Sequence, residues 1–275
     1  MNEISRPAAG GSATQSLPEP LQGKRQLGAG ASFCFDCRPE LDCFTECCSD
    51  VNIVLTPADV LGLARSAGLS TREFLDRHTL TPITKDLHLP VVMLRMEPGP
   101  GKRCPFVTAE GCSVYRERPW ACRMYPVGMA LPPARPGQAP TPVHFLFEDA
   151  FCHGRGERRS WTVEAWQRDQ GLGEREELEK AFRELVGHPW FIGGRQLDPR
   201  RIELFFMAAY DLDTFREFVF SSTFVKRFEL DAKLVSALRT DDRALLAFAL
   251  RWLRFAMFGE PTVQPRAAME REARP

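Results

Sequence analysis

Nine cysteines are the feature that most constrains how this chain of 275 residues folds. They are Cys34, Cys37, Cys43, Cys47, Cys48, Cys104, Cys112, Cys122 and Cys152. An odd number suits a disulfide framework poorly. In a reducing compartment, a dense cysteine pattern indicates metal binding or catalysis instead of disulfide bonds. The clustering therefore predicts a metal centre built from thiolates.

The rest of the composition narrows the location and the partners. No segment approaches 18 uninterrupted apolar residues, so we expect no membrane span. The N-terminal segment lacks the apolar core of a secretory signal, and we therefore expect a cytoplasmic protein. The formal net charge is zero, which makes nucleic acid an unlikely partner because phosphate binding needs surplus cations. A protein partner is compatible with the sequence, but nothing in it identifies one.

The distribution of cysteines suggests a division into two domains. We expect a disordered tail over residues 1–31 and a second one over 261–275, since neither has apolar periodicity. A cysteine-cluster metal-binding domain is expected over 32–158, and a helical domain over 159–260. The predicted fold class is α+β, mainly α: a small loop-rich domain with a few short strands, followed by a C-terminal helical domain that folds on its own.

Local signals predict several elements of the first part. Thr56 is expected to cap a helix that ends at Gly68, and Ser70 opens the next helix with a capping box. Leu87–Met96 is predicted to be a strand. Val127–Leu131 and Val143–Phe147 are predicted to be the two arms of a hairpin around a proline-rich loop.

The second part is predicted to be all-helical. Aspartates suited to N-caps mark the expected starts of four helices: Asp198, Asp213, Asp231, and either Asp241 or Asp242. Residues 244–258 (ALLAFALRWLRFAMF) are apolar apart from two arginines. They predict a buried helix that closes the core.

The metal-ligand candidates fall into two groups. The first is Cys37, Cys43, Cys47 and Cys48, and the second is Cys104, Cys112, Cys122 and Cys152. Cysteines two or three residues apart can turn their sulfurs toward one centre, as in zinc knuckles and iron–sulfur loops. Neighbouring side chains such as Cys47 and Cys48 tend to point apart. One of that pair, together with Cys34, is expected to be a buried, inert thiol.

The spacing favours an iron–sulfur cluster, specifically 4Fe–4S, and leaves zinc as the alternative. Zinc prefers compact C-x2–4-C pairs. The second group offers only longer intervals, and a cluster tolerates scattered ligands because four sulfurs surround a larger object. His153, next to Cys152, is a weaker ligand candidate. Arg118 and Arg123 are expected to donate hydrogen bonds to ligand sulfurs and to offset their negative charge.

The order of these motifs resembles the YkgJ-like cysteine-cluster family. The residues that carry the resemblance are Cys47-Cys48, then LTPADV, GLSTREFL, CPFV and EGCSVYRERPWACRMYP, over roughly residues 33–158. The five residues between Cys37 and Cys43 are a wider gap than the family pattern has. The resemblance implies a zinc, iron or iron–sulfur centre, and it places Tyr115 with Arg118 and Arg123 beside the ligands. Flagellin lysine N-methylases are distantly similar to the same family.

Two functions of different classes follow. The favoured one is a metal-binding protein with an accessory or interaction role. The alternative, implied by the resemblance, is an S-adenosylmethionine-dependent protein lysine methyltransferase, although the sequence has no glycine-rich dinucleotide-type fingerprint. No catalytic residue can be named. The acidic pairs Glu73/Asp76 and Glu164/Asp169 are expected to lie on solvated helix faces.

Overall fold

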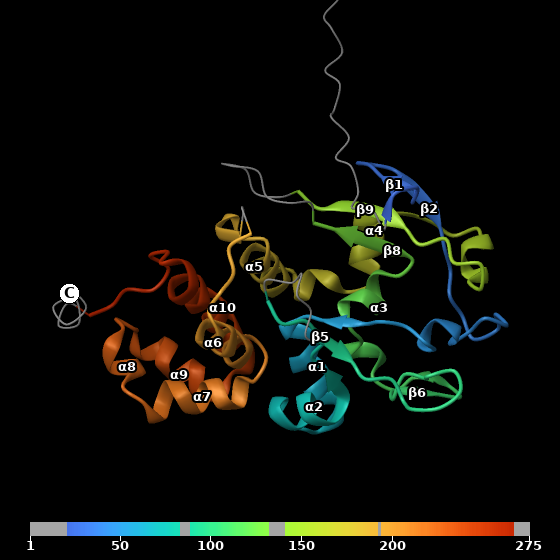
Figure 1. Ribbon diagram of the computed structural model, residues 1–275. Coiled ribbons are helices and arrows are strands. Elements are labelled where there is room, and N and C mark those ends of the chain that lie inside the picture. The colour runs from blue at the N-terminus through green and yellow to red at the C-terminus, as the bar shows by residue number, and fades with distance from the viewer. Residues whose placement is uncertain (1–20, 83–88, 132–140, 192–193, 267–275) are drawn as a thin grey trace, which may run out of the picture.

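The computed structural model describes residues 21–82, 89–131, 141–191 and 194–266 (Figure 1). Helices dominate, and the strands form small antiparallel sheets, so the predicted mainly α class with β elements is confirmed. The helices after α5 gather on one side of the molecule, and the sheets with most of the cysteine-bearing loops lie on the other (Figure 1).

The strands are short and pair in four sheets. Their bounds are β1 Gln26–Leu27, β2 Ser32–Cys34, β3 Val54–Leu55, β4 Thr79–Leu80, β5 Val92–Leu94, β6 Val107–Thr108, β7 Gly111–Cys112, β8 Val127–Ala130, β9 Val143–Leu146 and β10 Ser160–Thr162. The sheet orders are β1-β9-β8, β10-β2, β3-β5-β4 and β6-β7. The predicted hairpin is confirmed as β8 and β9, with Val127 opposite Leu146. The predicted strand at 87–96 is β5, although residues 87 and 88 lie outside the described residues.

The α-helices and 3-10 turns follow the capping signals closely. The helices are α1 Pro57–Ala67, α2 Thr71–His78, α3 Trp120–Met124, α4 Val163–Asp169, α5 Glu176–Val186, α6 Pro199–Ala209, α7 Leu212–Ser221, α8 Phe224–Arg227, α9 Ala232–Thr240 and α10 Asp242–Phe258. The 3-10 turns are η2 Glu46–Cys48, η3 Tyr115–Glu117, η4 His153–Gly156, η5 Leu172–Glu174 and η6 Pro189–Phe191.

The predicted caps of α1 and α2 are confirmed. Thr56 and Asp59 form a capping box, in which the Thr56 N–H donates to the Asp59 carboxylate at 3.0 Å. Gly68 ends α1 in the left-handed conformation at φ 67°, which glycine adopts without steric cost. Ser70 opens α2 with a second capping box.

In the C-terminal part, the caps at Asp198, Asp231 and Asp241 are confirmed. The start predicted at Asp213 is wrong, because Asp211 caps α7 instead. Asp213 lies in the first turn of α7, where its carboxylate accepts hydrogen bonds from the N–H and the hydroxyl of Thr71 at 2.7 and 2.6 Å. Its side chain therefore joins α7 to α2.

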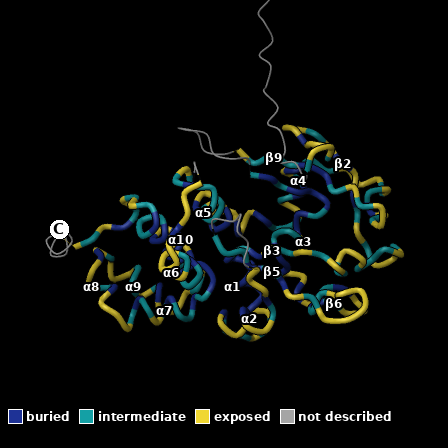
Figure 2. The backbone as a smooth tube through the Cα atoms, viewed as in Figure 1, coloured by how far each residue is buried: buried dark blue, intermediate teal, exposed yellow. Residues whose placement is uncertain are grey.

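The larger of two main apolar clusters, here called the helical core, contains the predicted buried helix α10. It also contains buried side chains of α1, α2, β3 and β5, for example Val60, Phe74 and Val92. Figure 2 shows buried residues along α1 and α10 and exposed ones on the outer side of α2. The helical core therefore draws on residues both before and after position 158. Whether residues 159–260 fold alone stays a prediction.

A smaller cluster, here called the sheet core, lies beside β2, β8 and β9. It consists of Leu27, Phe33, Phe35, Met124, Val127, Leu146, Val163, Trp166 and Leu172. Residues 21–31, which composition assigns to a tail, thus include β1 and the buried Leu27. At the other end, Val263 is buried in the helical core. No helix in the described part of the chain combines the length and the apolar character that crossing a lipid bilayer requires.

Candidate metal centre

All nine cysteines carry free thiols, and each residue is exposed or half-buried. The expectation that Cys34 is a buried thiol is wrong: it lies exposed in β2, opposite Ser160 of β10. Its side chain projects outward because the strand alternates, with Phe33 and Phe35 buried on the inner face. Inaccessibility therefore removes none of the nine as a ligand.

One gathering of thiols, here called the Cys122 group, consists of Cys47, Cys48, Cys104, Cys112 and Cys122. Desolvation by the protein around the sulfur is the main reason that the pKa of Cys122 is raised well above its usual value, although part of this residue is exposed. Asp59 and the thiols of Cys104, Cys47 and Cys112 add to the rise, which shows that these sulfurs lie within electrostatic reach. Three separate segments of the chain therefore meet at this place.

A second gathering, the Cys37 group, consists of Cys37, Cys43 and Cys152. Burial, followed by the nearby thiols of Cys47, Cys152 and Cys43, raises the pKa of Cys37 to about 11. The backbone N–H of His153 donates to the Cys43 sulfur at 3.3 Å. The His153 ring instead contacts the Asp42 carboxylate, with 3.0 Å between Nδ1 and Oδ1.

Cys47 lies within reach of both groups. The hydrogen bond between its thiol and that of Cys48 is the largest cause of its raised pKa. The two neighbouring side chains thus approach each other, contrary to the sequence expectation. The reason is local, since both residues lie in the tight turn η2, which the chain enters at Thr45 in a left-handed conformation.

One backbone hydrogen bond and several side-chain contacts clamp the η2 loop to the segment that carries Cys104. The N–H of Cys104 donates to the Cys48 carbonyl oxygen at 2.7 Å. Arg103 donates to the Thr45 hydroxyl at 3.2 Å, and the Lys102 ammonium lies 2.9 Å from the Asp50 carboxylate. These contacts place Cys47 and Cys48 beside Cys104. Sequence reasoning missed them; the signal was the basic pair directly before Cys104.

Three residues of this clamp have a strained backbone conformation. Thr45, Asp50 and Lys102 have φ values of 70°, 47° and 37°, and they are the non-glycine residues with positive φ in the described part of the chain. A β-branched residue such as Thr45 rarely adopts this conformation, because its side chain crowds the backbone. Strain of this kind clusters at functional sites, where surrounding contacts maintain it. Here it surrounds the Cys43–Cys48 loop and Cys104.

The arginines predicted to support the ligands are buried and bind backbone oxygens. Arg123 donates to the carbonyl oxygens of Arg118 at 3.0 Å and Gln170 at 2.7 Å, and also to that of Arg116. Arg118 donates to the Tyr115 carbonyl at 2.6 Å and stacks on the exposed Tyr115 ring at 3.8 Å. Their hydrogen bonds thus fix the turn between Cys112 and Cys122. That either one supports a bound metal stays a prediction.

Arg118 also acts at a distance on one thiol of the Cys122 group. Its positive charge lowers the pKa of Cys112, which burial raises more strongly. In the Cys37 group, the Tyr125 hydroxyl lies between the Cys152 thiol and the Asp149 carboxylate, 3.1 Å from the latter. Each group of thiols therefore has a polar neighbour from the segment around Cys122.

The donor set suits a thiophilic metal, but the sulfurs are not drawn together around a single ion. Thiolates are the preferred ligands of zinc and of iron–sulfur clusters. Among the described residues, no three cysteine, histidine or acidic side chains stand close enough to hold one ion. The raised thiol pKa values mean that ligand binding must displace protons, so that metal affinity should rise with pH.

The family comparison agrees with this donor chemistry. Residues 36–152 match the model of the CxxCxxCC family, described as a "Putative zinc- or iron-chelating domain". The matched segment starts after Cys34 and contains the other eight cysteines. The YkgJ-like resemblance seen in the sequence is consistent with this family. No curated protein and no solved structure matches the chain.

The matched segment is therefore similar to zinc- or iron-chelating domains, and it carries an abundance of soft ligands. Its Cys122 group packs against the helical core, in which Cys104 and Cys112 take part. Its Cys37 group reaches the sheet core through Cys152. A metal bound by either group would tie loops to one of the two apolar clusters.

Proposed function

We propose that the CxxCxxCC domain holds a thiolate-ligated 4Fe–4S cluster, with zinc as the alternative, in a cytoplasmic protein of accessory or interaction role. The observation that carries this proposal is the gathering of Cys47, Cys104, Cys112 and Cys122 from separate segments. Four cysteines are the ligand number that both a 4Fe–4S cluster and a structural zinc site use.

The spread of these sulfurs favours the cluster. A single zinc ion needs four sulfurs at about 2.3 Å from one point. A cluster has its ligand sulfurs at the periphery of a larger object and accepts a wider arrangement. The thiols of the Cys122 group are close enough to influence one another but do not converge on one ion position.

The remaining cysteines have weaker but specific support. Cys48 is fixed beside Cys104 by a backbone hydrogen bond and can replace Cys47 as the fourth ligand. Cys37, Cys43 and Cys152 lie near Cys47 and form a candidate second site. Arg118 and Arg123, with Tyr115 beside them, keep the predicted role of supporting the ligand sulfurs and offsetting their negative charge.

Metal analysis of protein purified without oxygen tests this proposal. We expect iron and acid-labile sulfide in equal amounts, with the broad visible absorbance of an iron–sulfur cluster that bleaches on exposure to air. Zinc near one ion per chain without visible absorbance would select the alternative. A folded, monodisperse chain that contains neither metal and takes up neither on reconstitution would contradict the proposal.

The methyltransferase alternative receives no support from the fold or from the family match. The acidic pairs that resemble acid–base residues are exposed on α2 and α4, as expected. The proposal is therefore restricted to metal binding.

A further inference from the structure

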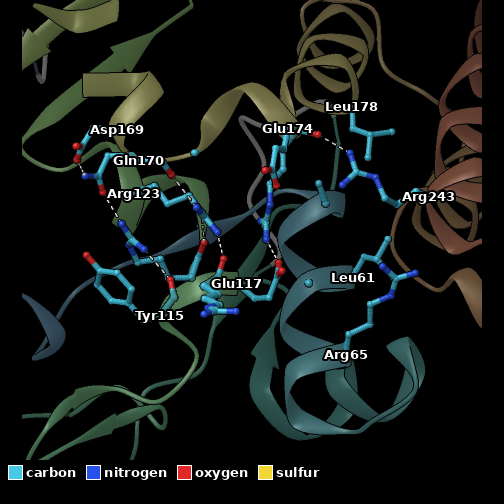
Figure 3. A pocket seen from close by; sticks show the side chains of 16 residues that line it. Leu61, Arg65, Tyr115, Glu117, Arg123, Asp169, Gln170, Glu174, Leu178 and Arg243 are labelled. Atoms are coloured by element: carbon cyan, nitrogen blue, oxygen red, sulfur yellow. Dashed lines mark hydrogen bonds and ion pairs between the residues drawn. The ribbon is translucent and has the colours of Figure 1, made fainter. Parts of the chain in front are cut away.

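A cavity of about 540 Å³ lies between α1, η3 and the segment that joins α4 to α5 (Figure 3). Its lining includes six arginines: Arg65, Arg116, Arg118, Arg123, Arg175 and Arg243. The acidic residues of the lining are Glu117, Asp169 and Glu174. The cavity is therefore strongly basic, although the chain as a whole is neutral.

Three of these six guanidinium groups donate hydrogen bonds to neutral oxygens. Arg118 and Arg123 donate to backbone carbonyls and to the Gln170 side chain. Arg243 donates to the Glu174 carbonyl oxygen. Such bonds satisfy the N–H groups but do not neutralise the charge. Three positive charges at the cavity thus lack a carboxylate partner in direct contact.

Of the other three arginines, carboxylates pair with two, and the third has no such partner among the described residues. Arg175 pairs with the buried Asp59 and with Glu117, and Arg65 pairs with Asp242 outside the lining. The guanidinium of Arg116 is exposed and has no hydrogen-bond partner in the described ranges. It therefore adds a fourth uncompensated charge at the cavity.

The lining carboxylates reduce this excess but do not cancel it, since among the described residues only Glu174 offers a lining carboxylate without an ion-pair partner. Asp169 is already shared with Arg159, which lies outside the lining, at 3.4 Å. Glu174 presents its carbonyl oxygen to Arg243. An anion that enters the cavity therefore meets more unpaired guanidinium groups than carboxylates.

The arginines occupy two ends of the cavity. Figure 3 shows Arg123 on one side near Tyr115 and Gln170, and Arg65 with Arg243 on the other side near Leu61. The ion pair of Glu117 and Arg175 lies between the two ends. A ligand that spans the cavity therefore meets positive charge at both ends.

We infer that this cavity binds a small molecule that carries two anionic groups, phosphate or carboxylate, one for each basic end. A guanidinium group matches both kinds of oxyanion with a pair of parallel hydrogen bonds. The cavity volume lies within the range of about 300–1,000 Å³ that is usual for small-molecule sites. The polar lining selects a charged metabolite over an apolar one.

Calorimetric titration of the full-length chain, as purified, tests the inference with two probes. Pyrophosphate represents the phosphate class, and citrate represents the carboxylate class. We expect one of them to bind at one site per chain with a Kd below about 1 mM at physiological salt. The probe that binds more tightly identifies the class of ligand.

Two substitutions locate the binding. Arg116→Ala and Arg243→Ala each remove an exposed side chain of the lining, and each should weaken binding by at least about tenfold, as expected for a lost charge-assisted hydrogen bond. The matched control is Arg200→Ala, an exposed arginine of α6 outside the lining, which should leave the affinity unchanged. Thermal melts of all three variants check that they are folded.

Absence of binding for both probes would overturn the inference. Equal affinity in the two cavity variants and in the wild type would also overturn it, because the anion would then sit elsewhere. Neither outcome bears on the metal, since iron, sulfide and zinc contents are measured separately on the same samples.

Discussion

The cysteine-bearing loops and the helical core show two different ways of stabilising a chain. Most of the largest fully buried side chains are on the C-terminal helices, for example Phe205, Phe215 and Leu250. By contrast, the loop that carries Cys43, Cys47 and Cys48 contributes none of them. Its short turns are held by a few backbone hydrogen bonds and by surface ion pairs.

The difference gives a physical reason for the position of the proposed metal ligands. Apolar burial contributes about 25 cal/mol per Å², and loops with little buried area gain little from it. Exposed ion pairs such as Lys102–Asp50 contribute about 0–1 kcal/mol. The thiolate–metal bonds that we propose would supply the missing cross-links. The cysteines of the Cys43–Cys48 loop thus lie in a segment that contributes no residue to either apolar core.

The largest expected effect comes from removing a metal ligand. Cys112→Ser or Cys122→Ser replaces a soft thiolate by a hydroxyl, which both zinc and cluster iron disfavour. We expect loss of the metal, and with it a large part of a binding free energy that reaches about 10–16 kcal/mol in structural zinc sites. Metal content and hydrogen exchange should show that residues 37–48 and 104–122 lose protection while α10 keeps it.

The matched control is Cys34→Ser, which alters an exposed thiol outside the family match. It should keep the metal in full. Arg123→Ala should lie between these extremes, with metal affinity about 10–100-fold weaker. Full metal in Cys112→Ser together with loss in Cys34→Ser would reverse the proposed ranking of ligands.

The next effect tests whether the two regions are separate in folding. Phe74 of α2 is fully buried in the helical core, although it precedes residue 158. Phe74→Ala should lower the free energy of unfolding by about 3–5 kcal/mol, and α6 to α10 should unfold in the same transition. Leu80→Ala, at a half-exposed position beside α2, should cost less than about 1 kcal/mol. Chemical denaturation followed by helical circular dichroism measures both.

An unchanged melt of the C-terminal helices in Phe74→Ala would instead support independent folding of residues 159–260. The composition of the sequence changes at residue 158, but packing need not follow composition. Apolar residues of α1 and α2 can complete a helical core whether or not their own segment contains cysteines.

Local features of the fold were readable from the sequence, and long-range ones were not. The caps at Thr56, Ser70 and Asp231 are hydrogen bonds between residues two or three positions apart, so a short stretch of sequence encodes them. The wrong start at Asp213 has a long-range cause, since its carboxylate serves Thr71, which is 142 positions away. Two nearby aspartates were both suitable caps, and tertiary contact assigned each its role.

The same limit applies to the candidate site. The choice of cysteines as ligands followed from residue type and clustering. The meeting of Cys47 with Cys104 depends on the clamp between their two loops, and no local pattern reveals it. The basic cavity joins arginines in or next to α1, η3, α3, η5 and α10, which only the folded chain brings together.

A smaller effect concerns a buried acid at the boundary of the helical core. Glu179 of α5 accepts a hydrogen bond from the Thr56 hydroxyl at 2.8 Å. Burial, with Asp59 next in importance, raises its pKa to about 8, while the hydrogen bond from Thr56 and the charges of Arg183 and Arg175 oppose the rise. At pH values between the ordinary pKa of a glutamate and about 8, Glu179 keeps its proton in the folded chain and releases it in the unfolded chain. Stability should therefore fall as the pH rises through this window.

Glu179→Gln removes this dependence and keeps an oxygen that accepts from Thr56. We expect the variant to be more stable than the wild type at pH 8.5 by on the order of 1–3 kcal/mol, and the gain should vanish near pH 4.5. Urea denaturation at both pH values measures it, with the exposed neighbour Glu177→Gln as the control. A gain that is the same at both pH values would show that Glu179 is ionised in the folded chain.

The smallest expected effect lies in the strained loop of the cysteine-bearing part. Thr45 has a φ of 70°, and its hydroxyl accepts one hydrogen bond from Arg103. Thr45→Gly and Thr45→Ala both remove that hydroxyl, but only glycine adopts the left-handed conformation without steric cost. The glycine variant should therefore hold the metal-free loop more stably than the alanine variant by about 1 kcal/mol. Amide exchange of residues 43–50 measures the difference, and exchange of α10 should be identical in the two variants.

Equal protection of the loop in the two variants would mean that Thr45 is not left-handed in solution. Any change in α10 would mean that the loop and the helical core are coupled more tightly than their separate means of stabilisation imply.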